Sequence, residues 1–210
     1  MPAIICGAGG YGEVYSHYMR DIGITIAGFL DDDPRKHGKY IGGTPVLGAT
    51  SKLNEMQSQS RFDVYAPIGN NPKRRQILES ARQLGFSTPR FIHPDSTIHS
   101  SVKLGEGTYV LPGSIIMPTS VLEDFVMLSV ATRVAHHTHI GRGVFLSTGA
   151  SVGAGITVEE DVYFGMSATA VTGKCRTIGK GAMIGSCSNV LSDVAAGSTM
   201  VGNPARPLER

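Results

Sequence analysis

The sequence has no tryptophan, few aromatic residues and few charges. Of its 210 residues, 7% are aromatic and 17% are charged, and 19 Lys and Arg residues against 17 Asp and Glu residues give a formal net charge of +2. A net charge so near zero provides no broad basic surface for nucleic acid or for an anionic membrane. Any anionic ligand is therefore expected to be bound locally.

Cysteine is also scarce, and Cys6, Cys175 and Cys187 show no CxxC spacing. No basic segment followed by a long apolar run opens the chain, so no secretory signal is predicted and the cytoplasm is the expected compartment. Nowhere do about 18 apolar residues follow one another, which excludes a membrane-spanning helix. We assign the cysteines no catalytic role, because a buried structural thiol is the commoner case.

Glycine, in contrast, is abundant, and a regular repeat accompanies it. The 27 glycines are about 13% of the chain, against a usual share of about 7%. From Ile92 to Phe164 every sixth residue is aliphatic or phenylalanine. The positions are Ile92, Ile98, Leu104, Val110, Ile116, Leu122, Leu128, Val134, Ile140, Leu146, Val152, Val158 and Phe164.

This period of six excludes a helix and a straight strand. Steps of six residues rotate by about 600° on an α-helix and would scatter these side chains over three faces. A strand would keep them on one face but would extend roughly 240 Å. The chain is therefore predicted to coil into a parallel β-solenoid, with the repeated side chains in an internal column.

The repeat has further regularities. The residue two positions before a column residue is usually small or branched, and glycines that suit corners often follow the column residue directly. The repeat is interrupted between Phe164 and Ile178, where fourteen residues stand in place of twelve. We expect Thr172-Gly173-Lys174 to protrude there as a small loop.

Residues 1–89 instead alternate between predicted strands and helices. A strand at Ala3 to Cys6 precedes the motif Gly7-x-Gly9-x-x-Gly12, which opens a helical segment. Asn71 is predicted to cap a later helix that has Pro72 in its first turn and runs to about Leu84. The change of pattern at Ser87-Thr88-Pro89 predicts two domains, a small Rossmann-like α/β domain at 1–89 and the solenoid at 90–210.

The glycine motif indicates a nucleotide-shaped ligand. Glycines between a strand and a helix let backbone N–H groups approach a phosphate, and Asp31 follows the second strand where a ribose acceptor is expected. The motif alone favours NAD, but about 90 residues fit a mononucleotide or sugar nucleotide better than a dinucleotide. Alternatively, the glycines serve only strand-to-helix packing. Gly69-Asn70-Asn71 could line the same crevice or form only a capped turn.

Four of the seven histidines, His99 and those of His136-His137-Thr138-His139, suggest either a metal or a base. With Ile140 inward, alternation places Thr138 inward, His137 and His139 outward, and His136 at the preceding corner. No carboxylate or cysteine stands at ligand spacing, so no metal is predicted. A general base is favoured, because histidine titrates near neutrality; the alternative is a set of solvated surface histidines.

Together these motifs resemble a known family. The period-six repeat is similar to that of the hexapeptide-repeat acyltransferases, whose repeats form a left-handed parallel β-helix. More narrowly, almost the whole chain resembles the NeuD/PglD-type sugar O- and N-acetyltransferases. The motifs that carry this resemblance are the glycine loop 7–12, Phe29-Leu30-Asp31-Asp32, Ile68-Gly69-Asn70-Asn71, the coil with His136, and Val201-Gly202-Asn203-Pro204-Ala205.

The resemblance implies a homotrimer that holds acetyl-CoA along the β-helix and a sugar nucleotide on the N-terminal domain. It assigns His136 as the base that takes the proton of the attacking sugar amine, with His137 as the second catalytic residue. The substrate-binding residues would be Gly9, Gly10, Tyr11, Gly12, Asp31, Asp32, Gly69, Asn70 and Asn71. The residues that bind acetyl-CoA would be Ala154, Gly165, Met166 and Ser186.

Two departures from the family pattern stand out. Tyr11 replaces a histidine of the glycine loop, and His137 replaces the acidic residue that commonly follows the base. With coils of 18 residues, as in the family, the stacked neighbours of His136 are Pro118 and Ala154, and neither is a carboxylate. An orienting carboxylate would have to come from elsewhere, for example from Asp124 or a neighbouring subunit.

The expected function is therefore acetyl-CoA-dependent N-acetylation of a nucleotide-activated amino sugar, such as a 4-amino-4,6-dideoxy sugar, for polysaccharide or glycan biosynthesis. Two alternatives remain open: O-acetylation of a sugar such as sialic acid, and a non-catalytic nucleotide-binding scaffold.

Overall fold

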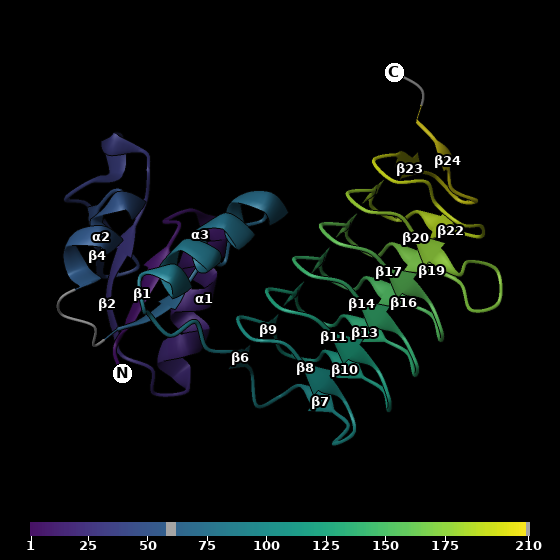
Figure 1. Cartoon of the computed structure of the whole chain (residues 1–210), viewed down its shortest axis with the longest axis horizontal. Coiled ribbons are helices and arrows are strands. Elements are labelled where there is room, and N and C mark those ends of the chain that lie inside the picture. Colours follow the sequence, from purple (N-terminus) through teal and green to yellow (C-terminus); the bar gives the residue numbers. More distant parts are fainter. Residues whose placement is uncertain (58–61, 209–210) are drawn as a thin grey trace. The chain divides into compact units, whose positions relative to one another are not determined.

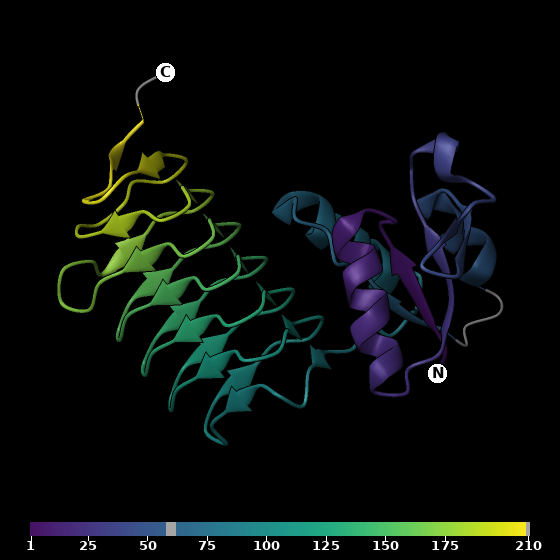
Figure 2. The ribbon, with the colours of Figure 1, turned by 180° about the vertical axis from the view of Figure 1, so that it is seen from behind.

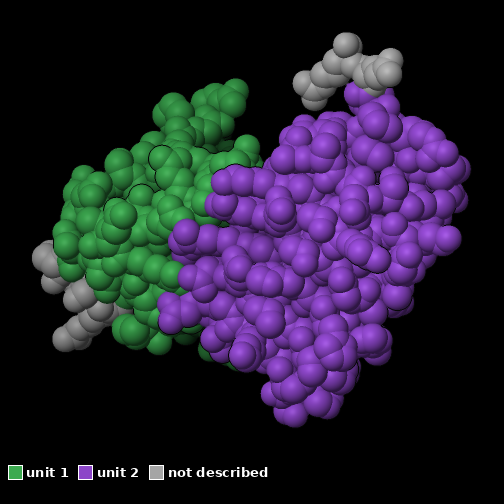
Figure 3. Space-filling view, turned by 45° about the vertical axis from the view of Figure 1, so that its right-hand side comes forward, with its two compact units in different colours: residues 1–89 green, residues 90–210 purple. Residues whose placement is uncertain are grey.

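The structure, a computed structural model, describes residues 1–57 and 62–208. It consists of two compact units, Met1–Pro89 and Arg90–Arg210, which Figure 3 colours separately. The division falls directly after Ser87-Thr88-Pro89, where the hydrophobic pattern of the sequence changes.

Unit 1 is a small α/β fold around a five-stranded sheet of order β3-β4-β2-β1-β5 (Figure 1). Its elements are β1 (Ala3–Cys6), α1 (Gly10–Asp21), β2 (Ile26–Leu30), η1 (Pro34–Lys36), β3 (Tyr40–Ile41), β4 (Thr44–Gly48), η2 (Thr50–Lys52), α2 (Leu53–Met56), β5 (Asp63–Tyr65) and α3 (Asn71–Gln83). All neighbouring strands are parallel except β3 and β4. The four residues of β1 are fully buried, as expected for a central strand of a parallel sheet.

The start of α3 differs from the prediction by one residue. Asn70, not Asn71, is the N-cap: its backbone is extended and its side chain accepts the N–H of Lys73 at 2.9 Å. Pro72 occupies the first turn, as predicted. Asn71 is buried, and its Oδ1 accepts a hydrogen bond from Arg74. Either asparagine can cap a helix, so only the backbone conformation distinguishes the two.

Unit 2 is a β-helix with three sheets, whose neighbouring strands are parallel except for β23 and β24 (Figures 1 and 2). The first sheet contains β6 (Phe91–Ile92), β9 (Tyr109–Val110), β12 (Met127–Leu128), β15 (Phe145–Leu146), β18 (Tyr163–Phe164), β21 (Met183–Ile184), β23 (Thr199–Val201) and β24 (Arg206–Pro207). The second sheet contains β7 (Thr97–Ile98), β10 (Ile115–Ile116), β13 (Arg133–Val134), β16 (Ser151–Val152), β19 (Thr169–Ala170) and β22 (Asn189–Val190). The third sheet contains β8 (Lys103–Leu104), β11 (Val121–Leu122), β14 (His139–Ile140), β17 (Thr157–Val158) and β20 (Thr177–Ile178).

The predicted internal column is confirmed. Ile116 pairs with Val134 and Val134 with Val152, so three repeats of six residues complete one coil. The column residues from Val110 to Phe164 are all buried in one continuous core. Hydrophobic burial along this column is the main stabilising contribution of a fold in which each coil contacts only its neighbours.

The small residues two positions before the column have a definite role. Buried hydroxyl groups there donate hydrogen bonds to backbone carbonyls of the next coil: Ser120 Oγ to Ala135 O and Thr138 Oγ1 to Gly153 O, each at 2.8 Å. Carbonyl oxygens at the corners, which the strand ladders leave free, are thereby satisfied inside the coil.

The glycines that follow column residues are required by close packing. A Cβ at Gly153 would lie 2.6 Å from the backbone N of Thr172, and one at Gly165 would lie 2.5 Å from the backbone N of Ser186. These glycines lack the positive φ of a left-handed turn, which occurs two residues later, with φ 68 at Gly155 and φ 55 at Ser167. Glycine is thus required at these positions because the backbone of the next coil lies too close to leave room for a side chain.

Two features interrupt the regular coils. Between β19 and β20 the chain forms the predicted loop at Thr172-Gly173-Lys174, which stands out from the β-helix in Figure 1. At the other interruption, β24 reverses direction and pairs antiparallel with β23, at the C-terminal end of the first sheet (Figure 2).

Candidate active site

The glycine loop of unit 1 follows β1 and leads into α1. A Cβ at Gly12 would collide with the carbonyl oxygen of Gly7, so Gly12 is needed for helix packing. At Gly9 and Gly10 a Cβ would meet nothing within 4 Å, and both residues are exposed. Packing therefore does not explain these two glycines, and their missing side chains leave the N-terminus of α1 open to a ligand.

Asp31 holds this loop from the neighbouring strand. Its Oδ2 accepts the N–H of Ala8 at 2.7 Å and lies 2.9 Å from Lys36 Nζ, and its Oδ1 accepts the N–H of Asp33 at 2.9 Å. Partial burial alone would raise the pKa of this carboxyl, but these hydrogen bonds outweigh it and lower the pKa below the ordinary value. Asp31 therefore fixes the glycine loop as an ionised carboxylate.

Asp32 connects three elements of unit 1. Its Oδ1 accepts hydrogen bonds from the hydroxyl group and the N–H of Thr50, at 2.6 and 3.0 Å, and Lys73 Nζ lies 3.1 Å from its Oδ2. Thr50 follows β4 and Lys73 lies in the first turn of α3. These hydrogen bonds, those of Thr50 first, lower the pKa of Asp32 to about 2.

We expect Asp32→Asn to make the stability of the protein less sensitive to acid. Because the pKa of Asp32 is about 2 in the folded protein and near its ordinary value of 3.8 in the unfolded chain, the unfolded chain binds the proton first as the pH falls. The stabilisation is thus fully present above about pH 4 and is lost between pH 4 and 2. Thermal unfolding curves from pH 7 to 2 should show a lower Tm for Asp32→Asn at pH 7 and a smaller further decrease below pH 4. The exposed Asp21→Asn is the matched control, and identical curves for Asp32→Asn and wild type would contradict this.

A buried arginine supports the third loop of unit 1. Arg74 is fully buried, and its Nη1 donates to the carbonyl oxygen of Ile68 at 2.6 Å and to Asn71 Oδ1 at 3.0 Å. It thereby fixes the turn Ile68-Gly69-Asn70 after β5. Since β2, β1 and β5 are adjacent and parallel, this turn, the glycine loop and Asp31 meet at one edge of the sheet. Sequence reasoning did not single out Arg74, because an arginine in an exposed helical pattern gives no sign of burial.

The histidine cluster of unit 2 lies at a corner between the second and third sheets. His136 and His137 form the turn between β13 and β14, and both are exposed. Thr138 is buried and His139 exposed, as the alternation predicts. His137 is exposed, as predicted, but it lies in the turn with φ 57 and not on a strand. Its Nδ1 is 2.9 Å from Nδ1 of His136, with the two rings perpendicular.

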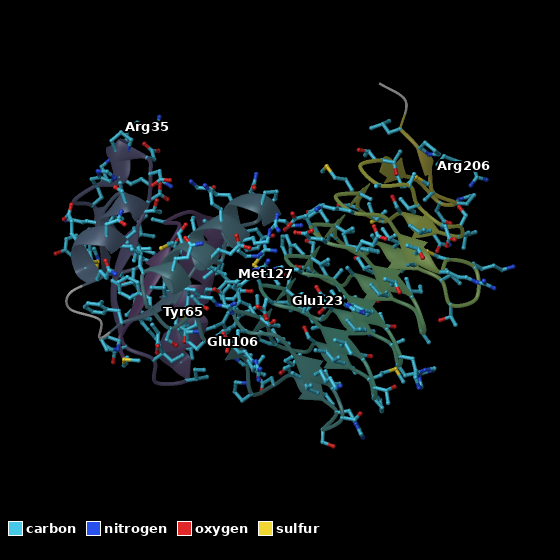
Figure 4. All side chains as sticks on the ribbon, viewed as in Figure 1. Arg35, Tyr65, Glu106, Glu123, Met127 and Arg206 are labelled. Atoms are coloured by element: carbon cyan, nitrogen blue, oxygen red, sulfur yellow. The ribbon has the colours of Figure 1, made fainter. Side chains whose placement is uncertain are left out.

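The carboxylates of the neighbouring coil have other partners. Nε2 of His139 lies 2.8 Å from Oε1 of Glu123, whose Oε2 accepts the N–H of Arg142 at 3.0 Å. Figure 4 shows Glu123 among the coils of the β-helix. Asp124 Oδ1 accepts the N–H of Glu106 at 2.8 Å. Asp124 lies in the corner between the third and first sheets, a different edge from that of His136, so the expectation that it orients His136 within the chain is wrong.

The four residues expected to bind acetyl-CoA lie on two edges of the β-helix. Ala154 follows β16 in the corner one coil beyond His136, and its N–H donates to Thr172 Oγ1 at 2.8 Å. Gly165, Met166 and Ser186 occupy successive corners between the first and second sheets. Cys187 N–H donates to Met166 O at 2.8 Å there, which keeps these two corners stacked. The two edges border the second sheet.

A groove of about 480 Å³ lies on the outer face of that second sheet. Its lining reaches Ala135 and Gly153 beside the His136 corner, and it includes the exposed side chains of Ile115 and Met117. Sequence reasoning missed this groove. Ile115 and Met117 could have indicated it, because they are apolar at outward positions where strand alternation predicts polar side chains.

The two buried cysteines, Cys6 and Cys175, have raised pKa values. Burial, followed by the negative charge of Asp32, raises the pKa of Cys6 to about 12; burial, followed by Asp193, raises the pKa of Cys175 to about 11. Both thiols thus stay protonated and are poor nucleophiles.

In residues 1–57 and 62–208 no three His, Cys, Asp or Glu side chains gather to hold a metal ion. No helix in these ranges is long and apolar enough to cross a membrane.

Known proteins match this arrangement over the full length. Residues 3–81 match the family model of the PglD N-terminal domain. The chain is 29% identical to a GDP-perosamine N-acetyltransferase of Escherichia coli, over 98% of this chain and 96% of that protein. It is 34% identical to the solved acetyltransferase domain of PglB from Neisseria gonorrhoeae, with 99% of each chain covered and a TM-score of 0.90.

A third comparison concerns a structure with ligands. A histidine-to-alanine mutant of GDP-perosamine N-acetyltransferase from Caulobacter crescentus, in complex with CoA and GDP-perosamine, is 28% identical. The match covers 100% of this chain and 98% of that chain, with a TM-score of 0.85.

The stacked period-six coils and the histidine corner define a left-handed parallel β-helix of the hexapeptide-repeat acyltransferase class. Within that class, the similarity of both units over their full length is decisive. The chain belongs to the NeuD/PglD family of sugar acetyltransferases.

Proposed function

We propose that the protein transfers the acetyl group of acetyl-CoA to the amino group of a nucleotide-activated amino sugar, such as a 4-amino-4,6-dideoxy sugar, for polysaccharide or glycan biosynthesis. The observation that carries the proposal is the exposed imidazole of His136, at the corner where the apolar groove of the second sheet ends. The full-length similarity to GDP-perosamine N-acetyltransferases, one of them solved with CoA and GDP-perosamine, supports this substrate class.

His136 is the general base of the proposed reaction. The sugar amine attacks the thioester carbonyl of acetyl-CoA, and Nε2 of His136 takes the proton that the amine loses as the C–N bond forms. Backbone N–H groups at the corner stabilise the negative oxygen of the tetrahedral intermediate. When the intermediate collapses, the C–S bond breaks, and the CoA thiolate leaves and takes up a proton.

Each unit has a proposed binding surface of its own. In unit 1, Gly9 and Gly10 leave the N-terminus of α1 open to the diphosphate, Tyr11 and Gly12 follow them in the first turn of that helix, and Asp31 fixes the glycine loop. Asp32, Gly69, Asn70 and Asn71 belong to the adjoining loops at the same sheet edge. In unit 2, Ala154 on one edge and Gly165, Met166 and Ser186 on the other border the groove that receives the pantetheine arm of acetyl-CoA.

The proposed assembly is a cytoplasmic homotrimer. Ile115 and Met117 expose about two-fifths of their surface, at 42% and 41%, on the second sheet. Contact with a neighbouring subunit would remove these apolar side chains from water. Light scattering after size-exclusion chromatography measures the oligomeric state directly, and a monomer at micromolar concentration would contradict the trimer.

The proposed function is tested by thiol release from acetyl-CoA with the purified protein. The panel contains UDP-, dTDP- and GDP-linked 3- and 4-amino sugars together with free sialic acid. Release with one nucleotide amino sugar, and mass spectrometric detection of its N-acetylated product, is the expected result. Release with sialic acid alone would replace it by O-acetylation. No release, together with no binding of acetyl-CoA, would favour a non-catalytic scaffold.

A further inference from the structure

The contact between His136 and His137 restricts which nitrogen of each ring carries a proton. The two Nδ1 atoms are 2.9 Å apart, the ring centroids are 5.1 Å apart, and the rings are perpendicular. Consecutive side chains of a strand point to opposite sides, but the positive φ of His137 brings the two rings together. The corner imposes this conformation, since Thr119 and Gly155, one coil before and one coil after, have φ 61 and 68.

A hydrogen bond between two imidazole nitrogens needs a single proton between them when both rings are neutral. If His136 Nδ1–H donates, its Nε2 is unprotonated and can act as a base. If His137 Nδ1–H donates, neutral His136 must carry its proton on Nε2, and it cannot accept another there. The two arrangements differ in activity although the heavy atoms are in the same places.

The geometry points to His137 as the positioning residue that accepts the Nδ1 proton of His136 and so keeps Nε2 of His136 free to act as the base. This inference rests on the proposed function and deepens it, because it assigns a neutral acceptor where related enzymes are expected to have a carboxylate. His136 directly follows Ala135, which lines the groove.

The neighbouring groups leave this role to His137. Directly stacked residues of the coils before and after, Pro118, Thr119, Ala154 and Gly155, have no titratable side chain. On the adjoining strand of the third sheet, His139 is bound to Glu123, whose other oxygen is held by Arg142 N–H. Other ionisable groups along this edge and its adjoining strands include Arg133 in β13, Lys103 in β8, Lys174 and Arg176 in the loop two coils on, and His99 two coils before, whose Nδ1 lies 2.9 Å from Ser101 Oγ.

Two variants of similar size separate positioning from simple space filling. In His137→Asn the Oδ1 atom occupies the place of Nδ1 and can accept the same hydrogen bond, and asparagine tolerates positive φ. His137→Leu has no acceptor. We expect His137→Asn to keep kcat/KM within about threefold of wild type at pH 8.5, whereas His137→Leu loses about tenfold or more in kcat. The KM for acetyl-CoA, measured in parallel, should differ little between the two variants, whereas the Tm of His137→Leu should be somewhat lower because leucine tolerates positive φ less well than asparagine. Equal activity of the two variants would overturn the assignment.

A measurement without substrate distinguishes failure of this inference from failure of the proposed function. Long-range ¹H–¹⁵N correlation spectra of the full chain labelled in histidine, at pH 8.5, report the protonated nitrogen of each ring. His136→Asn and His137→Asn assign the signals. The expected spectrum shows His136 protonated at Nδ1 and His137 at Nε2. A proton on Nε2 of His136 or on Nδ1 of His137 would overturn the inference, whichever sugar is acetylated.

Discussion

Replacing His136 with alanine is expected to lower kcat by about 10²-fold or more, because the sugar amine then loses its proton without a positioned base. The imidazole is exposed at a corner, so its removal leaves no cavity in the core. The Tm and the Kd for CoA should therefore stay close to those of the wild type. Steady-state thiol release, calorimetric unfolding and titration with CoA measure the three quantities.

His139→Ala is the matched control for that substitution. His139 is equally exposed and lies three residues further on, but its Nε2 is paired with Glu123 and it is outside the turn. We expect its kcat to be near that of the wild type. His137→Ala should fall between the two, since it removes the acceptor and not the base. Unchanged turnover in His136→Ala would move the role of base to His137 or His139, and a greater loss in His137→Ala than in His136→Ala would reverse our assignment.

The second large effect concerns stability: Phe164→Ala is expected to lower the free energy of unfolding by about 3–5 kcal/mol. Phe164 is fully buried in the column, between Leu146 on one coil and Ile184 on the next. Its removal leaves a cavity that the stacked backbones cannot close, because each coil is fixed by hydrogen bonds on both sides. Urea unfolding at one fixed subunit concentration measures the change, since dissociation of an oligomer would otherwise contribute.

Two further substitutions show whether the cavity causes that loss. Phe164→Leu keeps an apolar side chain in the column and should lose less than half as much stability. Met183→Ala removes a side chain that is 47% exposed on the neighbouring strand β21, and we expect a change below about 1 kcal/mol. A loss in Met183→Ala equal to that in Phe164→Ala would show that burial in the column is not the source of the effect.

The β-helix could be predicted from the sequence because its signal is strictly periodic. One buried position in six, sustained from Ile92 to Phe164, allows few folds, and all its later members lie in the core of the structure. The protruding loop was visible as two surplus residues. The N-cap of α3 was misplaced because Asn70 and Asn71 offer the same side chain, and the sequence does not distinguish which backbone is extended.

The candidate site was less predictable because it depends on which coils stack. The histidines stood out by their residue type, but the contact between His136 and His137 depends on a positive φ at one corner. The groove arises from Ile115, Arg133, Ser151 and Thr169, which are far apart in sequence and adjacent only after coiling. Arg74 shows no signal at all, since its burial follows from the packing of α3 and the turn that it holds.

The reversed strand β24 bears on a hazard of this architecture. A stack of parallel coils ends in open strand edges whose N–H and C=O groups can pair with another chain, and repetition in one direction would let such growth continue. β24 pairs with β23 in the opposite direction, and one of its two residues, Pro207, has no N–H to donate. The first sheet therefore ends in a strand of opposite direction, which is a poor template for the parallel pairing of a further coil.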